Sequence, residues 1–136
     1  MWKNYLVRGT VTVTGKRKRF GKGLVDYSNS YPFSRCNFIA LYEKDALCNA
    51  RSMFDKEEKR TLRYLQRSSK PYSHPCSFTF LDRFYTLPHV KLLTESIRVS
   101  YRIDSWKEII DYKETSFERA AEDLSMQQLR DIWFLE

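Results

Sequence analysis

A run of consecutive cations is the feature of this sequence with the most evident chemistry. The run and its neighbour are Lys16, Arg17, Lys18, Arg19 and Lys22. No acidic residue precedes Asp26, so these cations repel one another and would be stabilised by an external polyanion. Glycines on both sides predict a hairpin, and a basic β-ribbon can lie along phosphates or enter a groove. The alternatives are a solubilising loop or an edge strand whose charges prevent aggregation.

A second set of cations recurs at helical spacing. Its members are Lys56, Arg60, Arg63, Arg67 and Lys70. Spacings of four and three residues place them on one face of a helix over 55–70, with Phe54, Leu62 and Leu65 roughly opposite. Such a stripe could follow a phosphate backbone. The alternative is a solvated helix face whose cations are partly paired with Glu57 and Glu58.

Two further arginines lie on one side of a predicted strand. Residues 96–104 alternate between apolar and polar, with Arg98, Ser100 and Arg102 on the polar face. If that face is open, the arginines could extend the hairpin or the helix stripe into one basic patch. If a helix covers it, they must be paired with carboxylates.

Catalytic and metal chemistry have weaker support. His74 and His89 are the only histidines, and a two-histidine pair could cleave a phosphodiester without metal, but both lie beside prolines in predicted turns. Cys36, Cys48 and Cys76 with His74 are enough ligands for zinc, but they lack the paired short spacings of a zinc finger. We therefore expect no cofactor, no metal and no catalytic residue, and a nuclease remains a minor alternative.

The elements that would position these cations can be read from hydrophobic periodicity. Alternation over 5–14 predicts a strand, and Gly9 within it indicates a bulge or the close approach of another backbone. Further strands are predicted within 36–42, 76–85 and 96–104. Asp45 is the expected N-cap of a helix that continues to about Arg67, and the polar segment 26–35 is expected to be a loop. These elements predict an α+β fold with a four- to five-stranded, antiparallel-rich sheet and one long basic helix.

The last 34 residues differ from the rest in charge and pattern. Residues 1–102 contain 20 Lys and Arg against 8 Asp and Glu, a net charge of +12, whereas residues 103–136 contain 4 against 9, a net charge of −5. Capping-box patterns at Ser105, Thr115 and Ser125 predict two or three short C-terminal helices. Trp133 and Phe134 could anchor a protein partner or a homodimer there, or the last helix could simply pack on the sheet.

Composition restricts the class of protein. A chain of 136 residues, 42% hydrophobic and 15% aromatic, fits one domain with a packed core and excludes a disordered or fibrous protein. No apolar run is long enough to span a bilayer, and the first 13 residues contain Lys3 and Arg8, so no signal peptide is expected. Three cysteines without a CxxC pair are typical of free thiols in a reducing compartment, which predicts a cytoplasmic protein.

Charge placement then decides the functional hypothesis. An asymmetry this large favours nucleic-acid binding by the basic part. We expect a non-catalytic protein that contacts phosphates through the hairpin and the helix face, with DNA slightly preferred to RNA. The alternative is a small inhibitor or adaptor that binds another protein through its charged and aromatic surface, as a mobile element might encode.

Overall fold

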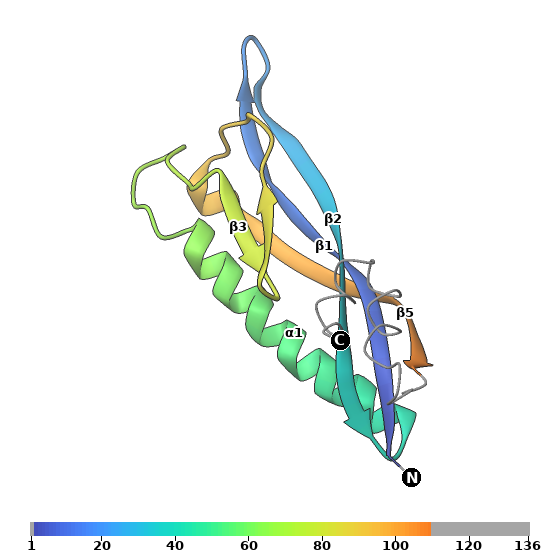
Figure 1. Ribbon diagram of the computed structural model, residues 1–136. Coiled ribbons are helices and arrows are strands. Elements are labelled where there is room, and N and C mark those ends of the chain that lie inside the picture. Colours follow the sequence, from blue (N-terminus) through green and yellow to red (C-terminus); the bar gives the residue numbers. More distant parts are fainter. Residues whose placement is uncertain (1, 110–136) are drawn as a thin grey trace. The chain divides into compact units, whose positions relative to one another are not determined.

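The computed structural model describes residues 2–109, which form a mixed α+β fold (Figure 1). The elements in chain order are β1 (Lys3–Arg19), β2 (Gly23–Ala40), α1 (Glu43–Leu65), β3 (Ser77–Phe80), β4 (Arg83–Thr86), the 3-10 helix η1 (Thr94–Ser96) and β5 (Arg98–Ile109). No helix in this range is long and apolar enough to cross a membrane. The predicted fold class is confirmed in its coarse form, with an antiparallel sheet and one long helix.

The strands form two sheets instead of the single one that the sequence predicts. The larger sheet has three strands in the order β2-β1-β5, and β3 and β4 form a separate antiparallel hairpin. In that hairpin Phe78 is opposite Tyr85, and Phe80 is opposite Arg83. The segment 76–85, predicted as one strand, therefore turns back on itself. Leu81 and Asp82 form its turn, with φ of 53° and 65°. Turns with positive φ usually contain glycine, and because this one does not, no local sequence signal indicates it.

The polar segment 26–35 is also a strand, contrary to the predicted loop. It belongs to β2, which is the first strand in the order β2-β1-β5 and has β1 as its one neighbour among residues 2–109. An edge strand tolerates proline because the missing amide faces outward, which accounts for Pro32. Ser28 and Ser30 are exposed and alternate with the half-buried Tyr27, Asn29 and Tyr31, because successive side chains of a strand point to opposite faces.

The described residues group into two compact units, to which β1, β2, α1 and β5 each contribute. In the first, which includes residues 2–8, 34–52 and 103–109, Leu6, Cys36 and Ile109 form a buried cluster. Asn37, with φ of 70°, interrupts the alternation of β2. Its backbone N–H donates to Asn4 Oδ1 at 2.9 Å, and Asn4 Nδ2 donates back to Asn37 Oδ1 at 3.0 Å.

The predicted capping box at Ser105 and Glu108 is wrong, because both residues belong to β5. A capping pattern of two residues is short, and here the pairing of β5 with β1 outweighs it. The patterns at Thr115 and Ser125 lie outside the described residues, as do Trp133 and Phe134. The predictions for residues 110–136 therefore stay predictions.

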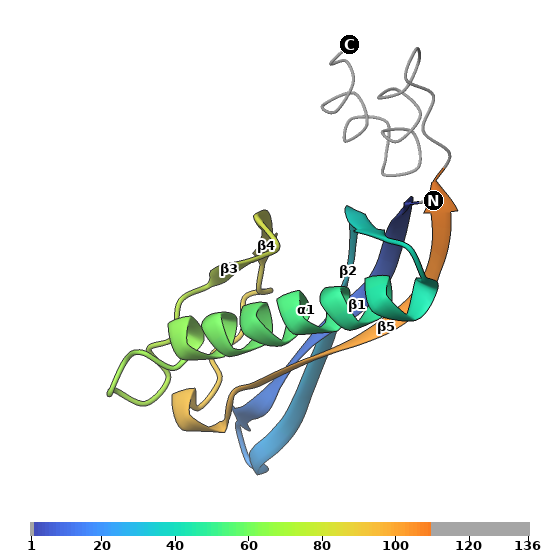
Figure 2. The ribbon, with the colours of Figure 1, turned by 90° about the horizontal axis from the view of Figure 1, so that it is seen from below.

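The second unit consists of residues 9–33 and 53–102 and contains every cation predicted as a binding residue. Its core is aromatic, with the Phe33 ring centroid 5.0 Å from that of Phe54 and 5.0 Å from that of Phe80. Phe54 also meets Tyr101 edge to face at 5.5 Å. These contacts hold the second half of α1 on one face of the sheet (Figure 2).

Gly9 allows this packing. A Cβ at Gly9 would lie 2.4 Å from the backbone oxygen of Arg102 and 2.5 Å from Cζ of Phe33. Both distances are below the closest approach of real carbon contacts, so no larger residue fits. The predicted close approach of another backbone at Gly9 is confirmed.

Candidate nucleic-acid interface

The basic run forms the end of the β1–β2 hairpin, as the sequence predicts. The backbone N–H of Lys22 donates to the carbonyl of Arg19 at 3.0 Å, which closes a four-residue turn. Gly21 has φ of 75°, a conformation that glycine adopts without steric cost. Phe20, the other central residue of the turn, is fully exposed at 105% relative accessibility. The turn therefore holds an aromatic ring in solvent between cations.

Most of the hairpin cations have no acidic partner among residues 2–109. Lys16 forms an ion pair with Asp26 across the hairpin. Arg17, Lys18, Arg19 and Lys22 form no ion pair with any described residue. Like charges held this close are stabilised when an anion arrives, and these four residues are the least compensated positive region of the hairpin.

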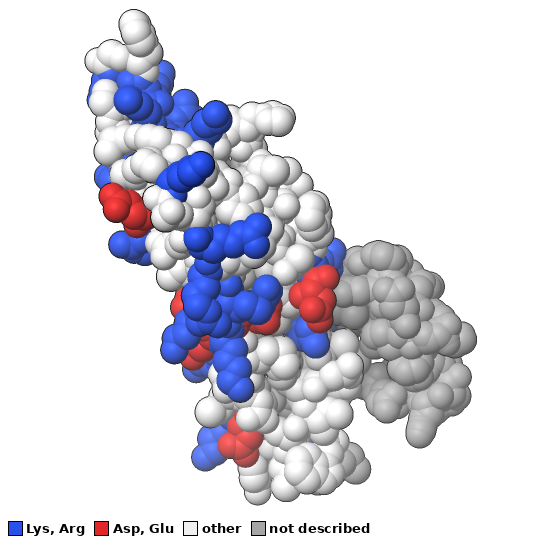
Figure 3. Space-filling view, turned by 90° about the vertical axis from the view of Figure 1, so that its left-hand side faces the viewer, with Lys and Arg blue, Asp and Glu red and all other residues white. Residues whose placement is uncertain are grey.

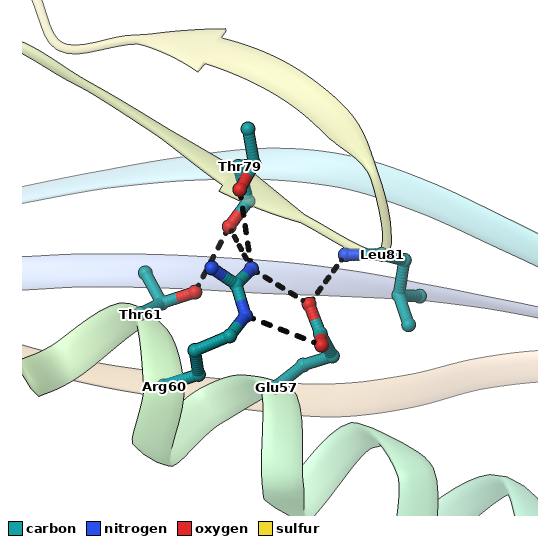
Figure 4. A network of polar contacts seen from close by, with 5 residues as sticks. All are labelled: Glu57, Arg60, Thr61, Thr79 and Leu81. Carbon is teal, nitrogen blue, oxygen red and sulfur yellow. Dashed lines mark hydrogen bonds and ion pairs between the residues drawn. The ribbon is translucent and has the colours of Figure 1, made fainter. Parts of the chain in front are cut away.

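Arg60 has a different environment, because its guanidinium contacts Glu57 of α1 and Thr79 of the β3–β4 hairpin (Figure 4). Its Nη2 donates to Glu57 Oε1 at 2.8 Å and to the carbonyl of Thr79 at 2.9 Å. Glu57 Oε1 also accepts from the backbone N–H of Leu81 at 2.8 Å, and the buried Thr61 donates to the same Thr79 carbonyl at 3.0 Å. Hydrogen bonding to Glu57 raises the pKa of Arg60. Arg60 thus ties the helix to the hairpin, and its charge is already balanced.

Other cations of α1 remain available. Lys56, Lys59 and Arg63 are exposed on the helix and form no hydrogen bond or ion pair with a described residue. The predicted five-membered helical stripe is wrong at its end, because α1 stops at Leu65. Arg67, whose guanidinium lies 4.7 Å from the centre of the Tyr64 ring, and Lys70 follow the helix in a loop. The helix itself begins at Glu43, two residues before the predicted cap.

Arg98 and Arg102 lie on the face of the sheet that α1 does not cover. Both are exposed and alternate with the buried Val99 and the half-buried Tyr101, whose ring contacts Phe54 of α1. Arg98 Nη1 donates to the carbonyls of Glu95 and Ile97, at 3.0 and 2.8 Å. Within residues 2–109, the exposure of both side chains agrees with the open-face alternative. The helix cations lie on the other side of the sheet, so Arg98 and Arg102 do not continue the helix stripe.

Figure 3 shows how Lys and Arg are distributed over one side of the molecule. They gather at the end that carries the β1–β2 turn and again at the level of α1, with separate cations between these places. Acidic residues on this side are fewer. The hairpin end carries four neighbouring cations without an ion pair among residues 2–109, which makes it the strongest candidate for contact with a polyanion.

Among residues 2–109, the cysteines and histidines considered for metal binding do not gather into a cluster. His74 is held by backbone contacts, since its Nε2 accepts from the N–H of Leu92 at 3.0 Å and its Nδ1 lies 2.7 Å from the carbonyl of Pro75. Cys36, Cys48 and Cys76 are free thiols. No group of three or more potential metal ligands occurs within the described range.

Three further side chains, Phe20, Tyr72 and Lys91, lie beside the basic run. Phe20 lies between Arg19 and Gly21, a turn position that indicates exposure of its side chain. Tyr72 and Lys91 line a cleft at the base of the hairpin with Arg17. No sequence signal brings these two residues together, because tertiary pairing alone places the segment around Lys91 beside β1.

Comparison with known proteins gives no family for this chain. No protein-family model matches it, and neither the curated proteins nor the solved structures contain a significant match.

Proposed function

We propose that the protein binds nucleic acid without chemistry of its own, through the end of the β1–β2 hairpin and, secondarily, through the exposed cations of α1. The observation that carries this proposal is the group of four hairpin cations without an acidic partner, arranged around a fully exposed Phe20. A solubilising loop would not need an aromatic ring at its tip, and exposed large apolar side chains commonly mark interaction sites.

The hairpin tip has the two components that nucleic-acid contacts use. Lys and Arg neutralise phosphates, which gives affinity without sequence information. An apolar side chain at the tip can insert between base steps, as wedge residues of architectural DNA-binding proteins do. We favour duplex DNA over RNA because a narrow two-stranded ribbon can enter the major groove of B-DNA, whereas the major groove of A-form RNA is too deep and narrow.

The salt dependence of binding tests the proposal most directly. We expect the affinity for a mixed-sequence DNA duplex, measured by fluorescence anisotropy, to fall linearly with the logarithm of salt concentration. The double variant Arg19→Gln/Lys22→Gln should lower the magnitude of the slope by about 1.8, since each phosphate contact contributes about 0.9 on B-DNA. Neither side chain forms an ion pair or hydrogen bond with residues 2–109, so stability should change by less than about 0.5 kcal/mol.

A matched control removes the same charge elsewhere. Lys44 and Arg83 are exposed and form no ion pair with a described residue, so Lys44→Gln/Arg83→Gln has the same net charge as the hairpin variant. We expect this control to leave the slope nearly unchanged. Equal effects of the two double variants would contradict a hairpin interface, and a wild-type protein that binds neither duplex DNA nor RNA would refute the function itself.

A protein-binding role is the second candidate, and exposed apolar side chains in the first unit favour it. These are Trp2, Ile39, Leu41, Tyr42 and Trp106, each more than 40% exposed. As an inhibitor or adaptor, the protein would retain a specific partner in pull-downs after nuclease treatment and show no shift on any polynucleotide. Loss of the retained partner on nuclease treatment would instead support the nucleic-acid proposal.

A further inference from the structure

The base of the basic hairpin borders a cleft of about 530 Å³. Its lining residues are Arg17, Lys18, Tyr72, His89, Val90 and Lys91. This volume is in the range of clefts that hold small ligands, about 300 to 1,000 Å³. Three of the six residues are cations and none is acidic.

The composition of this cleft distinguishes it from others of similar size in the second unit. A cleft of about 500 Å³ beside the end of α1 contains Glu95 together with Lys70 and Arg98. Another of about 530 Å³ contains Asp26, which pairs with Lys16. In both, an acidic group reduces the attraction for an anion. The cations of the hairpin-base cleft have no such neighbour in its lining, and none of them forms an ion pair with a described residue.

The walls of the cleft are held in place by backbone contacts. Arg17 and Leu92 form an antiparallel bridge, and the N–H of Leu93 donates to the carbonyl of Lys16 at 2.8 Å. On the other side, the N–H of Ser73 donates to Thr94 Oγ1 at 3.2 Å. These bonds fix the backbone of the segments that carry the lining residues, so these segments need not be ordered when a ligand arrives, which lowers the entropy cost of binding.

Tyr72 has a strained backbone at this cleft. Its φ is 61°, a left-handed conformation that costs an L-residue with a bulky side chain free energy and is concentrated at functional sites. Asparagine or glycine would adopt it more easily. An aromatic residue at this strained position places a ring beside three cations, which is the combination that binds a phosphate and a base together.

We propose that this cleft binds one unpaired, phosphorylated nucleotide at the end of a nucleic-acid strand. The cations would hold the phosphate, with Arg17 able to bind two of its oxygens, and the base would pack against Tyr72. The inference rests on the proposed function and adds to it a preference for strand ends with an unpaired 5′-phosphorylated nucleotide.

The test compares four forms of one DNA duplex by competition anisotropy at fixed ionic strength. The duplex is blunt, or carries a short 5′ overhang with a terminal phosphate, the same overhang with a terminal hydroxyl, or a phosphorylated overhang whose terminal nucleotide is abasic. We expect the phosphorylated overhang to bind about tenfold more tightly than the hydroxyl form, and about fivefold or more tightly than the abasic form.

Two variants separate the phosphate from the base. Lys91→Gln should remove most of the preference for phosphate and keep the preference for an intact base. Tyr72→Asn should do the opposite, and because asparagine accepts a positive φ, the variant should remain folded, as thermal unfolding can verify. Both variants should bind the blunt duplex like the wild type, because the hairpin tip is unchanged.

The outcomes distinguish the cleft from the interface. Equal affinity of the wild type for all four duplexes, or equal loss on all four in each variant, would overturn the cleft proposal and leave hairpin binding intact. Failure of the wild type to bind any of the four would refute the proposed function as well.

Discussion

Substituting Glu57 by alanine should destabilise the protein although the carboxylate is close to the surface. Glu57 Oε1 accepts from Arg60 Nη2 and from the backbone N–H of Leu81, each at 2.8 Å, and Oε2 accepts from Arg60 Nε at 3.3 Å. Alanine removes all three bonds without lowering helix propensity, since alanine is the best helix former. The expected cost therefore comes from the contacts with Arg60 and from the turn at Leu81.

The structure allows the magnitude to be assigned. The Glu57–Arg60 pair is worth at most about 1 kcal/mol, because the Arg60 side chain is 43% exposed and solvent screens the attraction. The buried Leu81 loses the partner of its N–H, which costs about 1 to 3 kcal/mol. That amide belongs to a turn in which Leu81 and Asp82 both have positive φ, so the turn depends on external hydrogen bonds. We expect unfolding to become easier by about 2 to 3 kcal/mol.

Urea unfolding followed by tryptophan fluorescence measures this change in unfolding free energy. A second variant separates the contribution of Arg60 from that of the hydrogen bond to Leu81. Arg60→Met keeps the bond from Leu81 to Glu57 and removes only the guanidinium, so it should cost less than Glu57→Ala. The double variant should be less destabilised than the sum of the single ones, with a coupling of about 0.5 to 1 kcal/mol. Lys59→Ala is the control, because it removes an adjacent exposed side chain that forms no hydrogen bond or ion pair with residues 2–109.

The reasoning would be refuted by a Glu57→Ala variant as stable as the Lys59→Ala control. The result also affects how binding is tested. An Arg60→Glu variant would place two carboxylates together and disturb the β3–β4 hairpin, so lost binding there would not show that Arg60 contacts nucleic acid. Lys56 and Arg63, which have no internal role in the described structure, are the suitable positions for charge substitutions on α1.

Further predictions concern packing, alkaline pH and the hairpin tip. Gly9→Ala should lower the unfolding free energy by about 1 to 3 kcal/mol or more, measured by urea, because its Cβ would overlap a backbone oxygen at 2.4 Å; wild-type stability would show that β1 can move aside. Burial raises the pKa of Tyr31 and Tyr85, so the neutral forms are favoured in the folded state. Their contribution is complete below the unfolded-state pKa of about 10 and is lost as pH rises through the raised values, so urea midpoints should fall above about pH 10, and less in Tyr85→Phe. Phe20→Ser should leave thermal stability within about 0.5 kcal/mol and lower duplex affinity about fivefold or more; unchanged affinity would exclude a role for the ring.

Several elements could be predicted from the sequence because they depend on local chemistry. The basic hairpin follows from alternation in β1 and from glycines at positions that need positive φ, and the long helix follows from apolar residues at spacings of three and four. Gly9 could be predicted as a point of close approach because a glycine within an alternating strand has no local reason to be there. In each case the physical cause lies within a few residues of the pattern.

The tertiary structure decided what a local pattern does not contain. The polar segment 26–35 is a strand because it pairs with β1 at the edge of the sheet. Ser105 is part of β5 instead of a helix cap because β5 also pairs with β1. The sequence also does not show which charges are paired. It shows that Arg60 is a cation, but only its position opposite Glu57 and Thr79 shows that its charge is already neutralised. The sequence by itself determined how many cations this protein has and where they occur along the chain. Which of them remain available to a polyanion was decided by distances between residues far apart in the chain, because electrostatic pairing depends on separation in space.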